Sequence, residues 1–262
     1  MNNELMYDQF STDYDRFVNW EGRLAVELPF LTAELAMLKG QDGQPVSVLD
    51  AACGTGQHAI ALAKEGFDVS GADISAKMID IARKNASAEQ LDLHFKQAGF
   101  GQLTTIFGGE SFDSLICLGN SLPHVLDEAA MLSTLEDFKS VLRPGGKIII
   151  QNRNFDSIVT ARERWMQPET YVESGNTWIF VRFYDFDPDG LITFNIIILT
   201  NIGNDGFQQH VISTRLWPFS HTQLVKWLEQ SGFGHIRLFG NLEGAPFSAE
   251  SSSNLVVTAY GV

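Results

Sequence analysis

The 262-residue chain has few cysteines, no metal-binding pattern of histidines and no long apolar run. Its two cysteines, Cys53 and Cys117, lie in an expected loop and an expected buried strand, which favours reduced thiols in a cytoplasmic protein. The six histidines lack metal-ligand spacing with cysteine or acidic partners, so we expect no metal. No apolar run approaches the roughly 20 residues of a membrane span. The polar segment MNNELMYDQF differs from a signal peptide, so we also expect no membrane partner.

Basic residues are also scarce. The chain has 18 Lys and Arg against 32 Asp and Glu, and its net charge is −14. Such a surface repels phosphate backbones, so we expect no nucleic-acid partner. Apolar residues, in contrast, make up 44% of the chain, which is ample for the core of one large α/β domain. Because repeats, linkers and low-complexity tracts are missing, we expect residues 1–262 to form a single domain.

The chain is organised around the segment Val46–His58, which reads VSVLDAACGTGQH. An apolar run ends in Asp50, a small-residue loop around Gly54 and Gly56 follows, and a helical pattern begins at once. This order of strand, glycine turn and helix brings backbone N–H groups and a helix N-terminus against a bound cofactor. Glycine suits the loop because a Cβ would block both its backbone angles and the approach of the ligand.

Two cofactors compete for this geometry. A nicotinamide dinucleotide is compatible, because Gly54–Ala59 fits a loose G-x-G-x-x-A pattern. The next expected strand, Phe67–Ala72, delivers Asp73 at the usual reach of a ribose. Asp50, however, would repel a pyrophosphate and suits a ligand with a cationic head, such as S-adenosylmethionine (SAM). We therefore favour SAM, and a plain strand–turn–helix corner without a ligand is the third interpretation.

Strand-like and helical segments alternate along most of the chain, which predicts an α/β fold with a doubly wound, seven-stranded, mostly parallel sheet. Besides the two strands above, we expect strands at Leu91–Lys96, Phe112–Leu118, Lys147–Gln151, His235–Phe239 and Leu255–Tyr260. Further helices are expected at Leu24–Leu38, Ser75–Asn85 (with Ser75 as N-cap), Asp127–Leu142 and Thr222–Ser231.

Residues 158–220 break this alternation. Three strands are expected there, at Thr177–Asp185, Leu191–Thr200 and Gln208–Trp217, separated by turns at Asp187–Gly190 and Asn201–Gly206. They predict an antiparallel β insertion, which serves either as a substrate wall or for edge protection and homo-oligomerisation. The aromatic segment Tyr7–Trp20 is compatible with a lid over the cofactor and with a set of hydrophobic anchors. We divide the domain into a helical lid (1–40), a cofactor-binding core (41–157), the insertion (158–220) and a closing helix with two strands (221–262).

Four motifs, VLDAACGTG, ADIS, FDSLICLGNS and LRPGGKIII, occur in an order that resembles the class I SAM-dependent methyltransferase family, strongly over residues 46–151. Two longer segments, Cys117–Val125 and Arg143–Ile158, are similar to the glycine N-methyltransferase group, which has a GNS-x-x-H loop and an R-N-[FY]-D segment. Two places depart from the pattern. The family usually has an acid or asparagine after the third strand, where this chain reads Ala98-Gly99-Phe100, and Arg162–Trp165 does not map onto the group.

The resemblance implies where the cofactor binds. Asp50, Gly54 and Gly56 would hold the methionine end, and Asp73 would hold the ribose hydroxyls. Arg23 falls where the group has an arginine that reaches the cofactor's carboxylate. The full set of cofactor-binding residues that we expect is Arg23, Asp50, Ala52, Gly54, Gly56, Asp73, Ile74, Met78, Gly99, Phe100 and Leu118.

The resemblance also implies an acceptor site. Asn120 would lie near the transferring methyl, and Arg153 would clamp an amino-acid carboxylate. A guanidinium at the end of a buried strand needs an anionic partner, and a substrate carboxylate matches its fork. An internal salt bridge to Asp156 or another acid is the alternative, and the sequence does not choose between the two.

Methyl transfer from SAM needs no metal and no acid, because the sulfonium is already an excellent leaving group. The protein positions the acceptor and excludes water, and an amine acceptor must lose its proton by desolvation or to a neighbour. Candidates near the methyl are Asn120 and His124, with a lid tyrosine, Tyr7 or Tyr14. A histidine in a loop-to-helix corner is, however, more often a structural hydrogen-bonding residue.

We therefore expect a SAM-dependent methyltransferase whose partner is a small-molecule acceptor, first of all the amine of an amino acid such as glycine. A small oxygen, carbon or sulfur nucleophile is the second hypothesis, because the segment after Asp156 is altered. A SAM-binding module without catalysis and a nicotinamide oxidoreductase follow. A macromolecular substrate is the least favoured, given the acidic composition.

Overall fold

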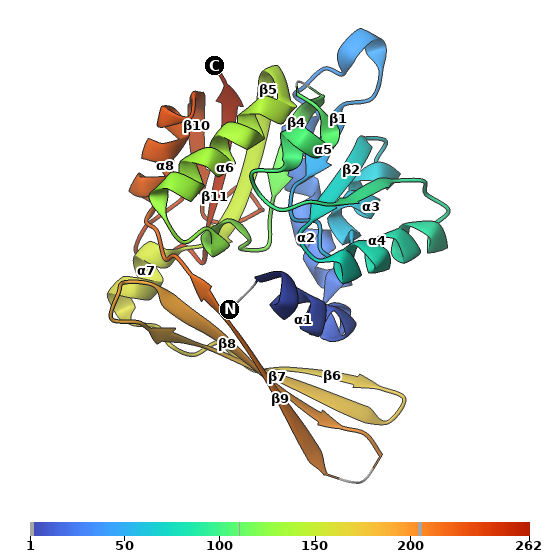
Figure 1. The fold of residues 1–262 in the computed structure, drawn as a ribbon, viewed down its shortest axis with the longest axis vertical. Helices are drawn as coiled ribbons and strands as arrows, with labels where there is room; N and C mark the ends of the chain where they lie inside the picture. Colours follow the sequence, from blue (N-terminus) through green and yellow to red (C-terminus); the bar gives the residue numbers. More distant parts are fainter. Residues whose placement is uncertain (1–2, 110, 204–205) are drawn as a thin grey trace.

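The computed structural model describes residues 3–109, 111–203 and 206–262. Its larger sheet has seven strands in the order β10-β11-β5-β4-β1-β2-β3 (Figure 1). β11 runs antiparallel to both of its neighbours, and the other pairs are parallel. The expected doubly wound, mostly parallel sheet is confirmed. Its strands are β1 (Ser47–Asp50), β2 (Asp68–Asp73), β3 (His94–Gln97), β4 (Phe112–Cys117), β5 (Leu142–Arg153), β10 (Phe233–Phe239) and β11 (Asn254–Gly261).

Helices cover both faces of this sheet. Apolar side chains of α5, α6 and α8 form the core on one face, and those of α2, α3 and α4 form the core on the other. These helices are α2 (Trp20–Leu35), α3 (Gln57–Lys64), α4 (Ala76–Ala88), α5 (Leu103–Phe107), α6 (Glu128–Val141) and α8 (His221–Gln230), and two short 3-10 turns are η1 (Gln41–Gly43) and η2 (Leu122–His124). The expected cap of α4 is present, because the Ser75 hydroxyl accepts a hydrogen bond from the backbone N–H of Met78.

The strand order places the loops that carry the motifs at one edge. All six residues of β4 are buried, as its nearly continuous apolar sequence predicts for a parallel strand covered on both faces. The chain leaves β1 toward β2 and β3 on one side, and it reaches β4 and β5 on the other. The loops after β1 and β4 therefore diverge and open a crevice at the carboxyl edge of the sheet.

A second, four-stranded antiparallel sheet lies below the larger one in the orientation of Figure 1, in the order β6-β7-β8-β9. Its strands are β6 (Glu169–Glu173), β7 (Asn176–Phe186), β8 (Ile192–Asn201) and β9 (Phe207–Leu216). The three expected strands are present, and β6 and the short helix α7 (Phe155–Ala161) are additions that the sequence pattern did not reveal. The expected turn at Asn201–Gly206 lies partly outside the described residues.

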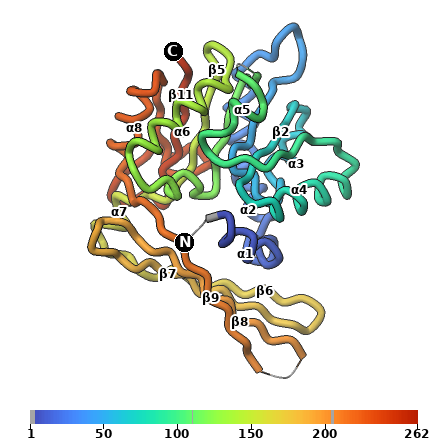
Figure 2. The backbone as a smooth tube through the Cα atoms, in the orientation of Figure 1, coloured from blue at the N-terminus to red at the C-terminus, as the bar shows by residue number. Residues whose placement is uncertain are grey.

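Helix α1 (Asn3–Phe17) lies between the two sheets, as Figures 1 and 2 show. Met6 and Phe10 are buried against Trp178, Phe180 and other apolar side chains of the second sheet. On its other side the helix contacts α4. The aromatic N-terminal segment thus anchors a helix to the second sheet and places that helix opposite the carboxyl edge of the first. Among the described residues, no helix combines the length and apolarity needed to span a membrane.

Candidate active site

A cavity of about 750 Å³ lies between the carboxyl edge of the larger sheet, α1 and the inner face of the second sheet. Most of the residues that the sequence singled out line it together, although they come from several helices and from the ends of five strands. These residues are Tyr14, Arg23, Ala52, Gly54, Asp73, Ile74, Met78, Gly99, Phe100, Asn120, His124 and Arg153. In the part of the chain that the structure describes, no group of three or more His, Cys, Asp and Glu residues could hold a metal ion.

Asp73 is held in place by the glycine loop (residues 51–56). Its Oδ2 accepts a hydrogen bond of 2.9 Å from the backbone N–H of Gly54, and its Oδ1 accepts one of 2.9 Å from Ser75. Burial raises the pKa of Asp73 to about 6, although these two backbone hydrogen bonds lower it. Gly54 has a φ of 53°, and an added Cβ would lie 3.5 Å from the Tyr14 ring. The loop, Asp73 and Tyr14 thus form one wall in which a side chain at Gly54 would intrude.

Three of the expected cofactor residues do not reach the cavity wall. Asp50 is 2% exposed at the end of β1, and Leu118 belongs to the apolar core under α2 and α3. Gly56 has a φ of 82°, and a Cβ there would lie 3.0 Å from both Ala82 and the Phe95 ring. A side chain at Gly56 would therefore disturb the helix–strand packing, and the role of Gly56 in cofactor binding stays a prediction.

Asp50 acts on the cavity through its charge. Burial raises the pKa of Asp50 to about 7, and the neighbouring Asp73 raises it further, against the backbone hydrogen bond from Ala52 and the Arg23 charge. Two carboxyl groups of elevated pKa thus lie at the end of β1 and β2. A cationic ligand in the cavity stabilises their ionised form, so this end of the cavity favours positive charge.

Two acidic residues of α1 attach the helix to the glycine loop and to α4. Asp8 accepts a hydrogen bond of 2.5 Å from the Ser75 hydroxyl. Asp15 accepts one of 2.6 Å from Thr55 and one of 2.8 Å from the indole N–H of Trp20. These contacts bring α1 over the cavity wall that carries Asp73. The aromatic segment is therefore both a cover and an anchor, the two roles between which the sequence did not choose.

Arg23 lies beside the end of β4, since a Cβ added to Gly119 would be 3.9 Å from its Nη2. Its Nε donates to Glu27 at 3.0 Å, and the other oxygen of Glu27 is 2.7 Å from His58. Burial raises the pKa of Glu27, but the hydrogen bond to His58 and the Arg23 charge bring it below its usual value. Arg23 is therefore held by an ionised partner, at the place where a ligand's carboxylate would find a cation.

The wall after β3 carries Ile74, Gly99 and Phe100, and it includes a residue that sequence reasoning missed. Gln102 lines the same wall, and its Oε1 accepts a hydrogen bond of 2.9 Å from the backbone N–H of Gly99. Phe100 packs edge-on against Phe138 with ring centroids 5.3 Å apart. The sequence signal for Gln102 was a polar side chain three residues beyond Gly99, in the segment where the family usually has an acid or asparagine.

Asn120 joins the ends of β4 and β5. The side-chain Oδ1 of Asn120 accepts a hydrogen bond of 2.8 Å from the backbone N–H of Arg153. The backbone N–H of Asn120 donates to the Gln151 carbonyl at 3.2 Å. Asn120 has a φ of 64°, a left-handed conformation that asparagine adopts more readily than most residues. With its oxygen engaged, the amide nitrogen is the end of this side chain that remains for a ligand.

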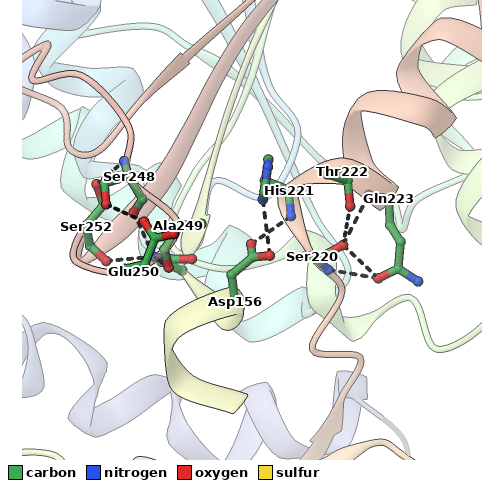
Figure 3. Close-up of polar contacts among 10 residues, drawn as sticks. Asp156, Ser220, His221, Thr222, Gln223, Ser248, Ala249, Glu250 and Ser252 are labelled. Atoms are coloured by element: carbon green, nitrogen blue, oxygen red, sulfur yellow. Dashed lines mark hydrogen bonds and ion pairs between the residues drawn. The ribbon is translucent and has the colours of Figure 1, made fainter. Parts of the chain in front are cut away.

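The Arg153 side chain lines the cavity without an anionic partner among the described residues. Its Nε is buried and has no hydrogen-bond partner there, and no ion pair involves it. Asp156, the alternative partner, instead lies 3.1 Å from Nδ1 of His221 and accepts a hydrogen bond of 2.8 Å from the His221 backbone N–H (Figure 3). The internal salt bridge between Arg153 and Asp156 is therefore excluded.

His124 contacts both the cover and the second sheet. Its Nε2 lies 2.7 Å from the Tyr7 hydroxyl, and its Nδ1 lies 3.4 Å from the Thr214 hydroxyl. Burial lowers the pKa of His124 to about 4, and burial raises that of Tyr7. A neutral imidazole therefore accepts the hydrogen bond of the Tyr7 hydroxyl. This is the structural hydrogen-bonding role that the sequence favoured for a corner histidine.

The second sheet contributes side chains that sequence reasoning did not name. Arg182, Tyr184, Phe194, Ile196 and Leu216 line the cavity from β7, β8 and β9. Burial raises the pKa of Tyr184 to about 12, against the charges of two arginines. The insertion is thus a wall of the cavity. The sequence signal for this role was Arg182, a charged residue on the same face of β7 as the aromatic Tyr184.

Comparison with known proteins identifies the family. A family model described as a methyltransferase domain matches residues 48–146. The glycine/sarcosine N-methyltransferase of Aphanothece halophytica is 31% identical over 89% of this chain and 82% of that protein. Its counterpart from Parasynechococcus marenigrum is 31% identical over 90% of this chain and 78% of that protein. The chain belongs to the class I SAM-dependent methyltransferases.

This methyltransferase has SAM as its cofactor. Its fold also resembles that of the CcbJ methyltransferase from Streptomyces caelestis, with a TM-score of 0.77 and 21% identity over 100% of both chains. The cavity fits the cofactor, because acidic groups of raised pKa lie at one end and Gly54 leaves room that a side chain would fill.

Proposed function

We propose that this methyltransferase transfers the methyl group to the amine of a small amino acid, such as glycine or a related compound. The observation that carries the proposal is Arg153, whose guanidinium lines the cavity without an anion to neutralise it. A charged group of this kind is costly to bury alone, and a carboxylate matches its planar fork. The names of the relatives point to the same substrate class.

The proposed cofactor position follows from the acidic wall. Asp73 accepts hydrogen bonds from the ribose hydroxyls with the lone pairs that Gly54 and Ser75 leave free. Arg23 binds the cofactor's carboxylate while Glu27 orients it. The adenine lies at Ile74, Met78, Gly99 and Phe100, where the amide nitrogen of Gln102 is available as a donor.

SAM supplies an activated methyl group when it is bound, so the chain's own residues bind, orient and exclude water. Asn120 and Arg153 come from adjacent strand ends that are linked by a direct hydrogen bond, which orients them with respect to each other. His124 is a weak base, because burial lowers its pKa to about 4. The amine therefore sheds its proton as it leaves water and enters the aromatic cavity. We expect activity to rise with pH toward the pKa of the acceptor amine.

The parts of the chain have separate roles in this proposal. Residues 1–40 cover the cofactor-binding core of residues 41–157, and residues 158–220 form the acceptor wall. Residues 221–262 complete the larger sheet, and the whole chain is one domain. A cytoplasmic location agrees with the two cysteines, which are free and buried.

The outer face of the second sheet supports a homo-oligomer. Val211 pairs with Ile197 and Ile197 with Val181 across the sheet, and Phe207 and Val172 lie on the same face. Val172 is 63% exposed, Phe207 54% and Val211 51%. Contiguous apolar side chains of this kind are typical of an interface. We expect light scattering to show more than one chain per particle, and Val211→Lys to reduce that mass without abolishing SAM binding.

The test of the proposed function is a panel of acceptors assayed with SAM. Carboxylated amines such as glycine should be methylated, and carboxylate-free amines, alcohols and thiols should not. Arg153→Met should lower kcat/KM for the carboxylated amine by about 100-fold, as expected for a lost bidentate charged contact. Arg164→Met is the matched control, because Arg164 pairs with the exposed Asp185 outside the cavity. Turnover of alcohols or thiols, but no amines, would replace this proposal with the second hypothesis.

A further inference from the structure

A second arginine lies on the same side of the cavity as Arg153. Arg182 projects from the inner face of β7, two residues before Tyr184, and both residues line the cavity. The charges of Arg153 and Arg182 both act on the Tyr184 hydroxyl and lower its pKa, against the burial that raises it. Burial lowers the pKa of Arg182 itself, and the charge of Arg153 lowers it further. Two cations that repel each other therefore share one part of the wall.

The guanidinium of Arg182 is only partly engaged. Its Nη2 donates to Glu169 and lies 3.4 Å from the Gln167 carbonyl oxygen. Its Nε is buried and has no hydrogen-bond partner among the described residues, as is the case for the Nε of Arg153. The guanidinium carbon lies 4.9 Å from the centre of the Phe17 ring, which restrains the plane of the group. Two buried guanidinium donors thus remain unpaired on one wall, which is unusual unless a ligand uses them.

The charges at this wall do not balance. Arg153 and Arg182 carry two positive charges. Glu169 pairs with Arg182 from a side chain that is 45% exposed, and the charge of the exposed Glu163 also acts on Tyr184. Among the described residues no acid forms an ion pair with Arg153, so its charge stays unpaired in a place where burial penalises it. A single carboxylate between the two guanidinium groups would neutralise the wall and accept hydrogen bonds from both unpaired Nε atoms.

We propose that Arg182 is the second arm of the acceptor's carboxylate site, and that Glu169 positions it. This inference rests on the proposed function, and it deepens that function by making the second sheet part of acceptor recognition. The site then selects monocarboxylate amines. A dicarboxylate brings one negative charge too many, and Glu169 repels it at the rim.

The decisive experiment compares Arg182→Met and Arg182→Lys with wild type on glycine, with the affinity for SAM as the control. Arg182→Met should raise the KM for glycine about tenfold and change kcat less, because it removes a binding contact rather than a reacting group. Arg182→Lys keeps the charge but loses the fork, so its KM should lie between the two. The affinity for SAM should stay within twofold of wild type for both variants.

Glu169→Gln provides an independent variant that keeps the shape of the wall. It should increase the ratio of aspartate to glycine turnover several-fold, because the rim charge that repels a second carboxylate is gone. Retention of SAM affinity reports that each variant is folded, so Arg182→Lys and Glu169→Gln carry the test if Arg182→Met does not fold.

Two results would overturn the inference in different ways. If the Arg182 variants keep the wild-type KM for glycine while Arg153→Met raises it, Arg182 is a structural residue and the proposed function stands. If the wild-type enzyme methylates none of the carboxylated amines, the proposed function fails, and the second arm fails with it.

Discussion

The two walls of the cavity are built differently. The proposed cofactor wall, which carries Asp73, consists of short local segments in which backbone N–H groups of Gly54 and Ser75 hold Asp73 at the end of a strand. The proposed acceptor wall consists of long side chains, Arg153 and Arg182, that come from two separate sheets. The first wall is acidic and the second is basic. This polarity matches a donor that carries a cation and an acceptor that carries an anion.

The difference indicates that cofactor binding depends on features that the whole fold shares, whereas acceptor specificity depends on the insertion. A wall made of backbone and one carboxylate depends on strand order, which every member of a fold shares. A wall made of side chains from an insertion depends on a few residues that substitution can alter. Each of the following experiments separates the two walls, and the expected effects run from the largest to the smallest.

Replacing Asp73 tests the cofactor wall most directly. Asp73→Ala should weaken SAM binding by about 10- to 100-fold, which is about 1.4–2.8 kcal/mol, because the ribose loses its acceptor and two backbone donors lose their partner. Calorimetric titration with SAM and its demethylated product measures it. Asp92→Ala, at an exposed position, is the control. Wild-type affinity in Asp73→Ala would show that the acidic wall does not bind the cofactor.

The pH dependence of SAM binding tests the charge of the same wall. The pKa values of about 7 for Asp50 and about 6 for Asp73 mean that both groups become protonated as pH falls. Because a cationic ligand favours the ionised forms, affinity should fall by about tenfold between about pH 8 and pH 6. Asp50→Asn should flatten this profile. A profile that is the same in both proteins would show that the Asp50 charge does not act on the bound cofactor.

Stability without ligand should respond to Asp50 in the opposite direction. The folded-state pKa of Asp50 lies above the reference value of 3.8, so ionisation at high pH costs stability that is regained as pH falls toward 4. Asp50→Asn should therefore melt at a higher temperature than wild type near pH 8, and the difference should shrink toward pH 4. Thermal melts of both proteins across this range measure it, and a constant difference would contradict the assignment.

Gly56→Ala tests whether a glycine of the loop serves the fold or the ligand. The left-handed φ costs an alanine about 1–2 kcal/mol, and its Cβ would meet Ala82 and Phe95 at 3.0 Å. We expect a lower free energy of unfolding in denaturant titrations, with SAM affinity changed less than twofold in the folded protein. A selective loss of SAM binding at unchanged stability would return Gly56 to the cofactor set.

Tyr7→Phe should have the smallest effect. It removes one neutral hydrogen bond to His124, worth about 1 kcal/mol, between the cover and the acceptor side. We expect kcat to fall by about fivefold or less, with an unchanged pH profile, because the proposed mechanism does not use His124 as the proton acceptor. A shifted pH optimum in steady-state assays would instead assign a proton-transfer role to the pair.

Sequence reasoning succeeded where the signal is local. Asp50, Gly54 and Asp73 follow from strand ends and a glycine turn, and Ser75 follows from capping chemistry that involves only its next three residues. Gly56 and Leu118, which were also predicted to bind the cofactor, pack against core residues and do not line the cavity, because a motif predicts the shape of a loop and not which of its atoms face the ligand.

The acceptor wall could not be predicted in the same way. Tyr7 meets His124 across 117 positions of sequence, and no local pattern encodes that pairing. The sequence allowed two partners for Arg153, a substrate carboxylate or an acid such as Asp156. In the structure Asp156 contacts His221, and Arg153 has no ion-pair partner among the described residues. Arg182 belongs to a strand that the sequence pattern predicts. Which face of that strand lies toward the cavity depends on how the second sheet packs against α1.

By itself, the sequence determined a doubly wound sheet, a SAM-type loop and the acidic end of the cavity. The reason is that hydrophobic periodicity, turn residues and helix caps depend only on residues a few positions apart. The tertiary structure decided which cations remain without partners and which sheet completes the acceptor wall. The physical reason is that a buried charge is neutralised by whatever the fold brings near it, and that neighbour can come from any part of the chain.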